Sequence, residues 1–373
     1  MSSLSEAKAE QPSILHTVQK AAADFGLPRV IILTTFIMLF VLAGIFNMNL
    51  PSFFGDVLRR WGMWGILVLA MVPSIQSGIG PNFGITVGIL GGMLGAVLSI
   101  EMRSAGVFDF ITNATMFGIS TAMAAIVLGV FFASIMGALY GMLLNRVKGS
   151  EMAVSVYVGF SALAIFNIVW ALIPVRTSTL ILPATGSGLR QMINLTDDFG
   201  GAFDGLFRFQ IGDMTVRLGL LSVFFVCCLL MWLFMRSRLG MMMSAAGSNP
   251  AYARASGINV DRMRILGTTI STALGAVGII IYAQSFGFLQ MYNAPQFYGF
   301  TVVASVLIGG ATVKRARIFD VLLGAFLFNG ILTIALPLAN VMMPDVPGVP
   351  EMLRLIITNG IILYALSKAK GGR

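Results

Sequence analysis

The residues that usually carry catalytic or metal chemistry are scarce in this sequence. It has one histidine, His16, before the first predicted membrane span, and two adjacent cysteines, Cys227 and Cys228. A lone histidine cannot build a histidine-based cluster, and neighbouring cysteines offer neither an unstrained disulfide nor a zinc spacing. The sequence also lacks a G-x-x-x-x-G-K-[ST] phosphate loop. We therefore predict no catalytic and no metal-binding residues, and an energy source in a partner protein or an ion gradient.

A short, well-capped helix is the most specific local pattern in the chain. Asn249 is a favourable N-cap, Pro250 suits the first helical position, and Gly257 suits the left-handed residue beyond the end. A helix of about two turns is marginal in water, so it needs a surface to pack on. That surface is either a separate subunit, which we favour, or the chain's own bundle. The residues predicted to meet the partner are Asn249, Pro250, Tyr252, Arg254, Ser256 and Gly257.

Polar side chains within the apolar segments are candidates for lining a solute pathway. They are Gln76, Ser77, Asn82, Thr86, Asn167, Tyr282, Gln284 and Asn329. Each of them could instead make an interhelical hydrogen bond, typically worth under about 2 kcal/mol. The stretch from Ser77 to Asn82 stands apart because glycine, proline and asparagine cluster there, and unwound backbone inside a membrane must be satisfied by protein or water. Almost no charge lies in mid-span, which argues against an ion-driven carrier.

The composition requires a polytopic membrane protein. Of 373 residues 57% are hydrophobic, and only 39 are charged, 24 Lys or Arg and 15 Asp or Glu. A soluble chain of this length carries about 93 charged residues. Windows of 26, 40 and 49 residues have no charge at all, and about 20 apolar residues span a membrane. Soluble enzymes, nucleic-acid binders and secreted disulfide-rich modules are thereby excluded.

The charge-free windows and the turn signals within them predict an all-α fold of about ten transmembrane helices. A broken-helix region is expected near residues 77–84, where Gly, Pro and Asn interrupt the 40-residue window. The predicted spans are 30–50, 61–79, 83–100, 117–144, 152–173, 218–235, 265–286, 296–313, 319–338 and 351–367. We divide the chain into a cytoplasmic segment (1–29) with an amphipathic surface helix from Ser13 to Phe25, a transmembrane domain (30–367) and a cytoplasmic tail (368–373).

The distribution of basic residues predicts the orientation. With ten spans both termini share one side, and placing them in the cytoplasm puts 16 basic residues inside and 8 outside. This asymmetry follows the positive-inside rule, and it accounts for the net charge of +9 without a nucleic-acid partner. The capped helix then lies in the cytoplasm. On the outer side, the aromatic turn 286–300 is either an interfacial belt or a docking surface, and the loop 176–217 with its aspartates is a second candidate surface.

Three segments resemble one family of membrane proteins. The stretch SAAGSNPAYARASGINVDRMRI, which holds the capped helix, resembles the cytoplasmic coupling segment of bacterial ATP-binding cassette (ABC) importer permeases of the ribose and simple-sugar type, which include branched-chain amino-acid relatives. The segment ASVLIGGATVKRARIFDVLLGAFLFNGI is similar to that family's late glycine pair and following span. A weaker match, GMLLNRVKGSEMAVSVYVGFSAL, is similar to its early cytoplasmic turn.

The resemblance implies a permease subunit in the bacterial inner membrane that does not hydrolyse ATP itself. Its partners would be cytoplasmic ATPase subunits that bind ATP and Mg²⁺, a second permease subunit of the same or another kind, an extracytoplasmic solute-binding protein, and membrane lipid. The chain itself would bind no cofactor, and the capped helix would be the coupling helix. The solute would be small and polar, most often a sugar or a nucleoside in this family. A stand-alone secondary carrier is the alternative.

One departure from the family pattern affects the substrate. Sugar permeases of this family usually have Gly-Gly-Ile-Asp-Leu-Ser at the break after the second span. This chain reads Ser-Gly-Ile-Gly-Pro-Asn from Ser77 to Asn82, without an acid. We therefore do not assign a simple pentose as the solute.

Overall fold

The computed structural model describes most of the chain. It covers residues 27–173, 192–292 and 294–343, and residues 348, 351–352, 355–356, 358–360 and 362–363. The predicted amphipathic helix, much of the last predicted span and the tail at 368–373 lie outside the described residues.

The described residues fold mainly into helices, because a helix satisfies the backbone polar groups of an apolar segment internally. In chain order the helices are α2 (Leu27–Ile45), α3 (Leu50–Leu69), α4 (Met71–Gln76), the 3₁₀ turn η1 (Phe83–Ile85), α5 (Thr86–Ser104), α6 (Ala114–Arg146), α7 (Glu151–Leu172), α9 (Leu218–Arg236), α10 (Arg238–Ser248), α11 (Pro250–Ala255), α12 (Val260–Phe286), α13 (Ala294–Ile308) and α14 (Ile318–Met342). The strands are β1 (Met192–Asn194), β2 (Arg208–Ile211), β3 (Met214–Arg217) and β4 (Phe288–Gln290).

Six helices in the described residues are long and apolar enough to cross a membrane. They are η1 with α5, α6, α7, α9, α12 and α14, and α2 and α13 are shorter apolar helices. The helix α3 carries Asp56, Arg59 and Arg60, and α13 ends early at a glycine pair, where Gly310 has a φ of 104°. A polytopic helical membrane protein is therefore confirmed, whereas the predicted number of ten spans is not.

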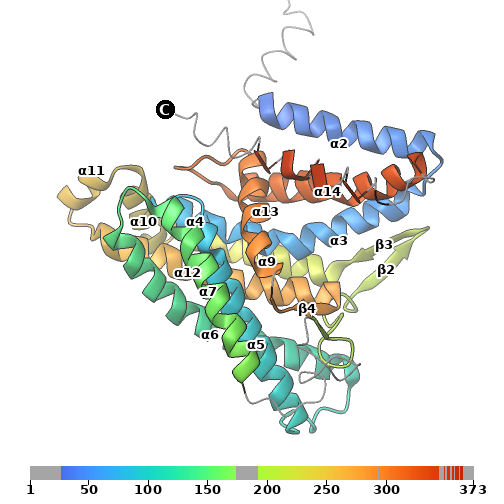
Figure 1. The fold of residues 1–373 in the computed structure, drawn as a ribbon, viewed down its shortest axis with the longest axis horizontal. Helices are drawn as coiled ribbons and strands as arrows, with labels where there is room; N and C mark the ends of the chain where they lie inside the picture. The colour runs from blue at the N-terminus through green and yellow to red at the C-terminus, as the bar shows by residue number, and fades with distance from the viewer. Residues whose placement is uncertain are drawn as a thin grey trace, which may run out of the picture.

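The helix α12 lies at the centre of the molecule (Figure 1). It contacts α3 and α4 as well as α5 and α6, while α2, α3 and α14 pack together beside it. The helices α5, α6 and α12 approach closely because glycines face each other's backbones: a Cβ atom on Gly92 would lie 2.7 Å from the Cα atom of Ala276. Helices α10 and α11 lie at one end of the molecule, and β2 and β3 lie at the other. We call these the α11 end and the strand end.

The predicted break after the second helical segment is present. The helix α4 ends at Gln76, and the chain turns through Gly78 and Gly80, whose φ angles are 81° and 95°. Such angles strain any residue with a Cβ atom, which explains the glycines. After Pro81 and Asn82 the short η1 leads into α5, which runs away from the turn toward the opposite side of the molecule. The turn lies at the α11 end, so the break joins two helices there.

Two small antiparallel sheets at the strand end were not predicted. Strand β1 pairs with β4, with Ile193 opposite Leu289, and β2 pairs with β3 in a hairpin. The hairpin packs on the start of α3, where Asn49 donates a hydrogen bond of 2.7 Å to Asp213. Residues 192–217 are therefore fastened to both α3 and the strand that follows α12.

Candidate functional site

The capped helix forms where the sequence predicts it. Asn249 accepts a hydrogen bond of 3.1 Å from the backbone nitrogen of Tyr252, and Pro250 occupies the first helical position of α11. Gly257 follows the helix with a φ of 81°. Asn249 and Pro250 therefore define the start of α11, and Gly257 defines its end.

The two faces of α11 differ sharply. Ala253 is fully buried and packs with Ala246 of α10 and Val260 of α12. Tyr252 is 69% exposed, and Arg254 and Ser256 are also exposed. The inner face therefore attaches α11 to its own bundle, while the outer face presents an aromatic ring and a guanidinium at the end of the molecule.

The helix α10, which the sequence analysis missed, rests on the turn after α4. A Cβ atom on Gly247 would collide with the carbonyl oxygen of Gln76 and lie 2.7 Å from the backbone nitrogen of Gly78. From the other side, a Cβ atom on Gly267 of α12 would meet the side chain of Ser77 at 2.5 Å. Three elements thus meet at the turn with no room for a methyl group. Two of the predicted pathway residues, Gln76 and Ser77, lie in this junction.

Ion pairs fix the start of α12 to the connection between α6 and α7. Arg264 and Glu151 are paired at 2.5 Å, with side chains 10% and 14% exposed. Lys148 and Asp261 form a second, exposed pair at 2.6 Å. The sequence analysis did not single out these residues, because a charge at a helix end gives no signal of its partner. The pairs hold α12 against the neighbouring helices directly after α11.

A buried polar network surrounds Asn82. Its side-chain nitrogen donates to Ser271 of α12 at 2.9 Å, and its oxygen accepts from the hydroxyl of Tyr140 of α6 at 3.0 Å. The Asn82 side chain is 1% exposed. The neighbouring predicted residue, Thr86, donates to the carbonyl oxygen of Pro295 at 3.3 Å. The turn is thereby joined to both α6 and α12 by side-chain hydrogen bonds.

The side chains of Gln76, at the turn, and of Asn329, in α14, make hydrogen bonds to backbone carbonyl groups. Gln76 donates to Ala316 at 2.6 Å, and Asn329 donates to Ala325 within α14 at 2.9 Å. Interhelical or intrahelical bonding is the ordinary use of such groups in a membrane.

The remaining predicted pathway residues, Tyr282, Asn167 and Gln284, do not take part in the network around Asn82. Tyr282 packs between Trp64 and Tyr298, with ring centroids 5.0 Å and 5.2 Å away. The side-chain oxygen of Asn167 is buried and has no hydrogen-bond partner within the described part of the chain, and the same holds for the indole nitrogen of Trp170 one turn later. The structure does not bring all eight predicted residues together: four lie around the turn, and the others are dispersed.

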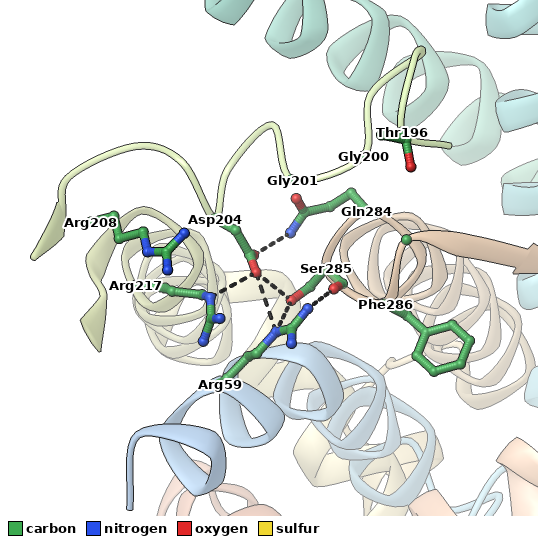
Figure 2. A pocket seen from close by; sticks show the side chains of 11 residues that line it. Arg59, Thr196, Gly200, Gly201, Asp204, Arg208, Arg217, Gln284, Ser285 and Phe286 are labelled. Carbon is green, nitrogen blue, oxygen red and sulfur yellow. Dashed lines mark hydrogen bonds and ion pairs between the residues drawn. The ribbon is translucent and has the colours of Figure 1, made fainter. Parts of the chain in front are cut away.

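The strand end holds a polar cavity of about 280 Å³, which contains the eighth residue, Gln284 (Figure 2). Asp204 lies at its centre, with its Oδ2 atom 3.4 Å from Nε of Arg59 and 3.3 Å from Nε of Arg217. Gln284 and Ser285, at the end of α12, donate to Asp204 at 3.0 Å and 2.8 Å. The carboxylate of Asp204 thus connects three elements: α3 through Arg59, β3 through Arg217, and the end of α12 through Gln284 and Ser285.

The cavity carries an excess of positive charge. Arg208 lines it together with Arg59 and Arg217, against the single carboxylate of Asp204. Burial lowers the pKa of Arg217, and the charges of Arg59 and Arg208 act in the same direction, against the opposing charges of Asp204 and Asp56. An acidic group entering from outside would therefore be attracted here.

A buried ion pair anchors the same segment to α5. Arg103 and Asp198 are paired at 2.5 Å, and the Asp198 side chain is only 1% exposed. Burial raises the pKa of Asp198, although the hydrogen bond and charge of Arg103 act in the opposite direction.

In residues 27–173, 192–292, 294–343 and the short described pieces beyond, no group of three or more His, Cys, Asp or Glu side chains is placed to hold a metal ion.

Comparison with known proteins identifies one family. The model of the family described as "Branched-chain amino acid transport system / permease component" matches residues 53–366. No solved structure matches the chain.

Several curated proteins are similar to the chain. The nucleoside ABC transporter permease protein NupC of Lactococcus lactis subsp. cremoris is 24% identical over 277 residues, which cover 70% of this chain and 79% of that protein. The permease NupB of the same organism is 26% identical over 159 residues, 42% of this chain and 40% of that protein. The fructose import permease protein FrcC of Rhizobium meliloti is 29% identical over 133 residues, 35% and 36% of the two chains. The alignments with NupB and FrcC span about two-fifths of those relatives.

Proposed function

The chain belongs to the branched-chain amino acid transport system permease component family, and on that premise we propose that it forms the transmembrane pathway of an ABC importer. It would be a multi-pass protein of the bacterial inner membrane with both termini in the cytoplasm, so the α11 end would be cytoplasmic. The basic residues around α10 and α11 support this orientation. Transport, and not catalysis, is its proposed role.

The proposed solute is a small polar molecule, either a nucleoside or a sugar. Of the relatives described above, the nucleoside permease NupC is aligned over 79% of its length and the fructose permease over 36%. A nucleoside is therefore the first solute to test. The missing acid at the turn, where sugar permeases of the family have one, is consistent with this choice.

The observation that carries the proposal is the two-faced helix α11. Its buried Ala253 ties it to α10 and α12, while Tyr252 and Arg254 project from the end of the molecule. We infer that a cytoplasmic ATPase subunit docks on Tyr252 and Arg254. That subunit would bind ATP and Mg²⁺, whereas this chain would use no cofactor of its own.

Movement of α11 would pass to the turn through backbone contacts. The helix α10 touches Gln76 and Gly78 with no gap, and Asn82 bonds to α6 and α12 a few residues later. Packed backbones transmit a displacement with little loss, because neither side has a flexible side chain to absorb it. ATP-driven closure of the ATPase pair would thus shift the turn, and the bonds of Asn82 would be remade between outward-open and inward-open states.

Further partners are proposed for the opposite end and for the membrane. The positive cavity around Arg59, Arg208 and Arg217 supports docking of an extracytoplasmic solute-binding protein at the strand end. A second permease subunit, identical or related, would complete the pathway within the bilayer.

The docking proposal is tested by reversing the charge on α11. In cells that express the complete importer, Arg254→Glu should reduce both co-purification of the ATPase subunit and solute uptake at least tenfold. The matched control is Arg262→Glu, an exposed arginine of the same cytoplasmic segment that lies outside α11. It should retain most of both activities.

Two results would reject the proposal. Unchanged co-purification and uptake in Arg254→Glu would remove α11 from the docking surface. Uptake that continues without any ATPase subunit would mean that the chain works as a secondary carrier.

A further inference from the structure

A second cavity lies at the α11 end, at the level where several helices terminate. It has a volume of about 370 Å³ and is lined by residues of four elements: Gln76 of α4, Trp232 of α9, Ser244 of α10, and Arg317 and Phe319 at the start of α14. The apolar helix α9 ends here at Arg236, and the apolar helix α14 begins here directly after Arg317. Helix ends flanked by basic residues and tryptophan are typical of the lipid headgroup level.

The mouth of this cavity is strongly basic. The guanidinium of Arg236 lies 3.8 Å from the centroid of the Trp232 ring, and Arg317 lines the cavity itself. Lys314 and Arg315 precede Arg317 in the same exposed connection. Within the described residues, none of these four basic side chains has a carboxylate at ion-pair distance.

The carboxylate of Asp320, beside Arg317, already has hydrogen-bond partners. Asp320 is buried and accepts from the side chain of Arg29 at 3.5 Å and from the backbone nitrogen of Arg317 at 2.8 Å. The basic side chains at the cavity mouth therefore face it with a net positive charge.

An apolar surface continues directly from this basic mouth. Trp232 is 42% exposed and Phe319 is 57% exposed at the cavity, and one turn before Trp232 the same helix α9 exposes Leu229. A ligand that satisfies both regions needs a negative head and an apolar body. Inorganic phosphate offers only the first of these, and a neutral lipid offers only the second.

We propose that this cavity binds the headgroup of an anionic phospholipid, with its phosphate between Arg236 and Arg317 and its acyl chains along α9. Basic pockets between helices at the cytoplasmic side of a membrane are suited to such headgroups. Because Gln76 and Ser244 form one wall, the lipid touches both elements of the junction between α4 and α10. Binding of the lipid does not depend on the proposed transport function, so the two can fail separately.

The test is lipid retention by the purified chain. Native mass spectrometry with phosphatidylglycerol and phosphatidylcholine of equal acyl chains should show selective retention of phosphatidylglycerol. The double substitution Arg236→Gln with Arg317→Gln should reduce this retention by about fivefold for each arginine removed. The control, Arg146→Gln with Arg262→Gln, removes two exposed arginines of the same end that do not line the cavity, and it should retain the lipid.

A variant that fills the cavity distinguishes binding inside the cavity from general attraction of the lipid to the basic side chains. Ser244→Phe keeps every arginine and should also lose phosphatidylglycerol. Equal retention in wild type, the double variant and Ser244→Phe would overturn the proposal. Displacement of the lipid by millimolar inorganic phosphate would identify free phosphate as the ligand instead, and displacement by the ATPase subunit would make the cavity part of a protein interface. Either result would also overturn the proposal.

Discussion

The contact between α10 and the turn after α4 can be tested with one methyl group. In Gly247→Ala, the added Cβ atom meets the carbonyl oxygen of Gln76 and the backbone nitrogen of Gly78. Both are backbone atoms, so neither can rotate away as a side chain could. The turn or α10 must shift, and the close contact through which we propose that α11 acts on the turn must open.

The magnitude follows from two opposing effects. Alanine is favoured over glycine in a helix by about 1 kcal/mol. Overpacking of a tight contact costs about 1–3 kcal/mol, and rigid backbone neighbours put this site near the upper value. The net effect of Gly247→Ala is therefore a loss of about 2 kcal/mol in the free energy of unfolding.

Gly118→Ala is the matched control for this substitution. It also lies in a helix, but the nearest atom to its Cβ position is an ordinary 3.6 Å away. It should keep the helix-propensity gain of about 1 kcal/mol, so the two variants should differ by about 3 kcal/mol.

The assay combines stability with transport. Unfolding of the purified variants in detergent reports the stability difference, and uptake in cells with the complete importer reports the coupling. We expect Gly247→Ala to lose most uptake at normal membrane abundance, and Gly118→Ala to keep it. If Gly247→Ala is as stable and as active as Gly118→Ala, then α10 does not rest on the turn and the proposed route of movement is wrong.

Three further outcomes are expected. Asn82→Leu should lower the free energy of unfolding by about 1–3 kcal/mol, because it leaves two buried hydroxyl groups without their partner; a loss below about 0.5 kcal/mol in detergent unfolding would contradict the network. Arg264→Met should destabilise by about 3–5 kcal/mol, while a double-mutant cycle with Glu151→Gln should show strong coupling, and additive effects would argue against a direct pair. Because burial raises the pKa of Asp198, its ionised form costs stability; the stability of wild type relative to Asp198→Asn should fall as pH rises from about 4 through that raised pKa, and a rise would contradict the sign.

The features that depend on neighbouring residues could be predicted from the sequence. The cap of α11 needs only Asn249, Pro250 and Gly257 within nine positions, and the structure has all three in the expected roles. The turn at Ser77–Asn82 follows in the same way from its glycines and proline. These features depend on the backbone preferences of a few neighbouring residues, which can be read directly from the sequence.

The contacts between distant segments could not be predicted. Tyr140 and Ser271 lie 58 and 189 positions from Asn82, and nothing in either local sequence indicates a shared hydrogen bond. Gln284 shows the same limit. Its polarity within an apolar segment predicts a pathway residue, and this stays a prediction, but nothing in the local sequence indicates the hydrogen bond that its amide donates to Asp204 at the strand end. Periodicity gives the face of a helix but not its depth or its partner.

The predicted number of ten spans is not confirmed, because the sequence does not show where charged residues of a helix find their partners. The second predicted span is divided between α3 and α4, and α3 carries three charged residues, of which Arg59 pairs with Asp204 at the strand end. The window without charges began only after Arg60, so the sequence analysis placed the span where the charges stop. The helix itself begins eleven residues before the predicted start at residue 61, at Leu50.

The length of α12 has a thermodynamic consequence. This single helix of 27 residues extends about 40 Å, from the capped segment after α11 to the pair Gln284 and Ser285 that holds Asp204. Two ligands that each bias the position of one rigid element must influence each other equally. If the proposed ATPase subunit on α11 changes the affinity of the strand end for the proposed binding protein by some factor, then the binding protein must change the affinity of α11 for the ATPase subunit by the same factor. The ratio of the affinities measured with and without the other partner should therefore be the same for both ligands.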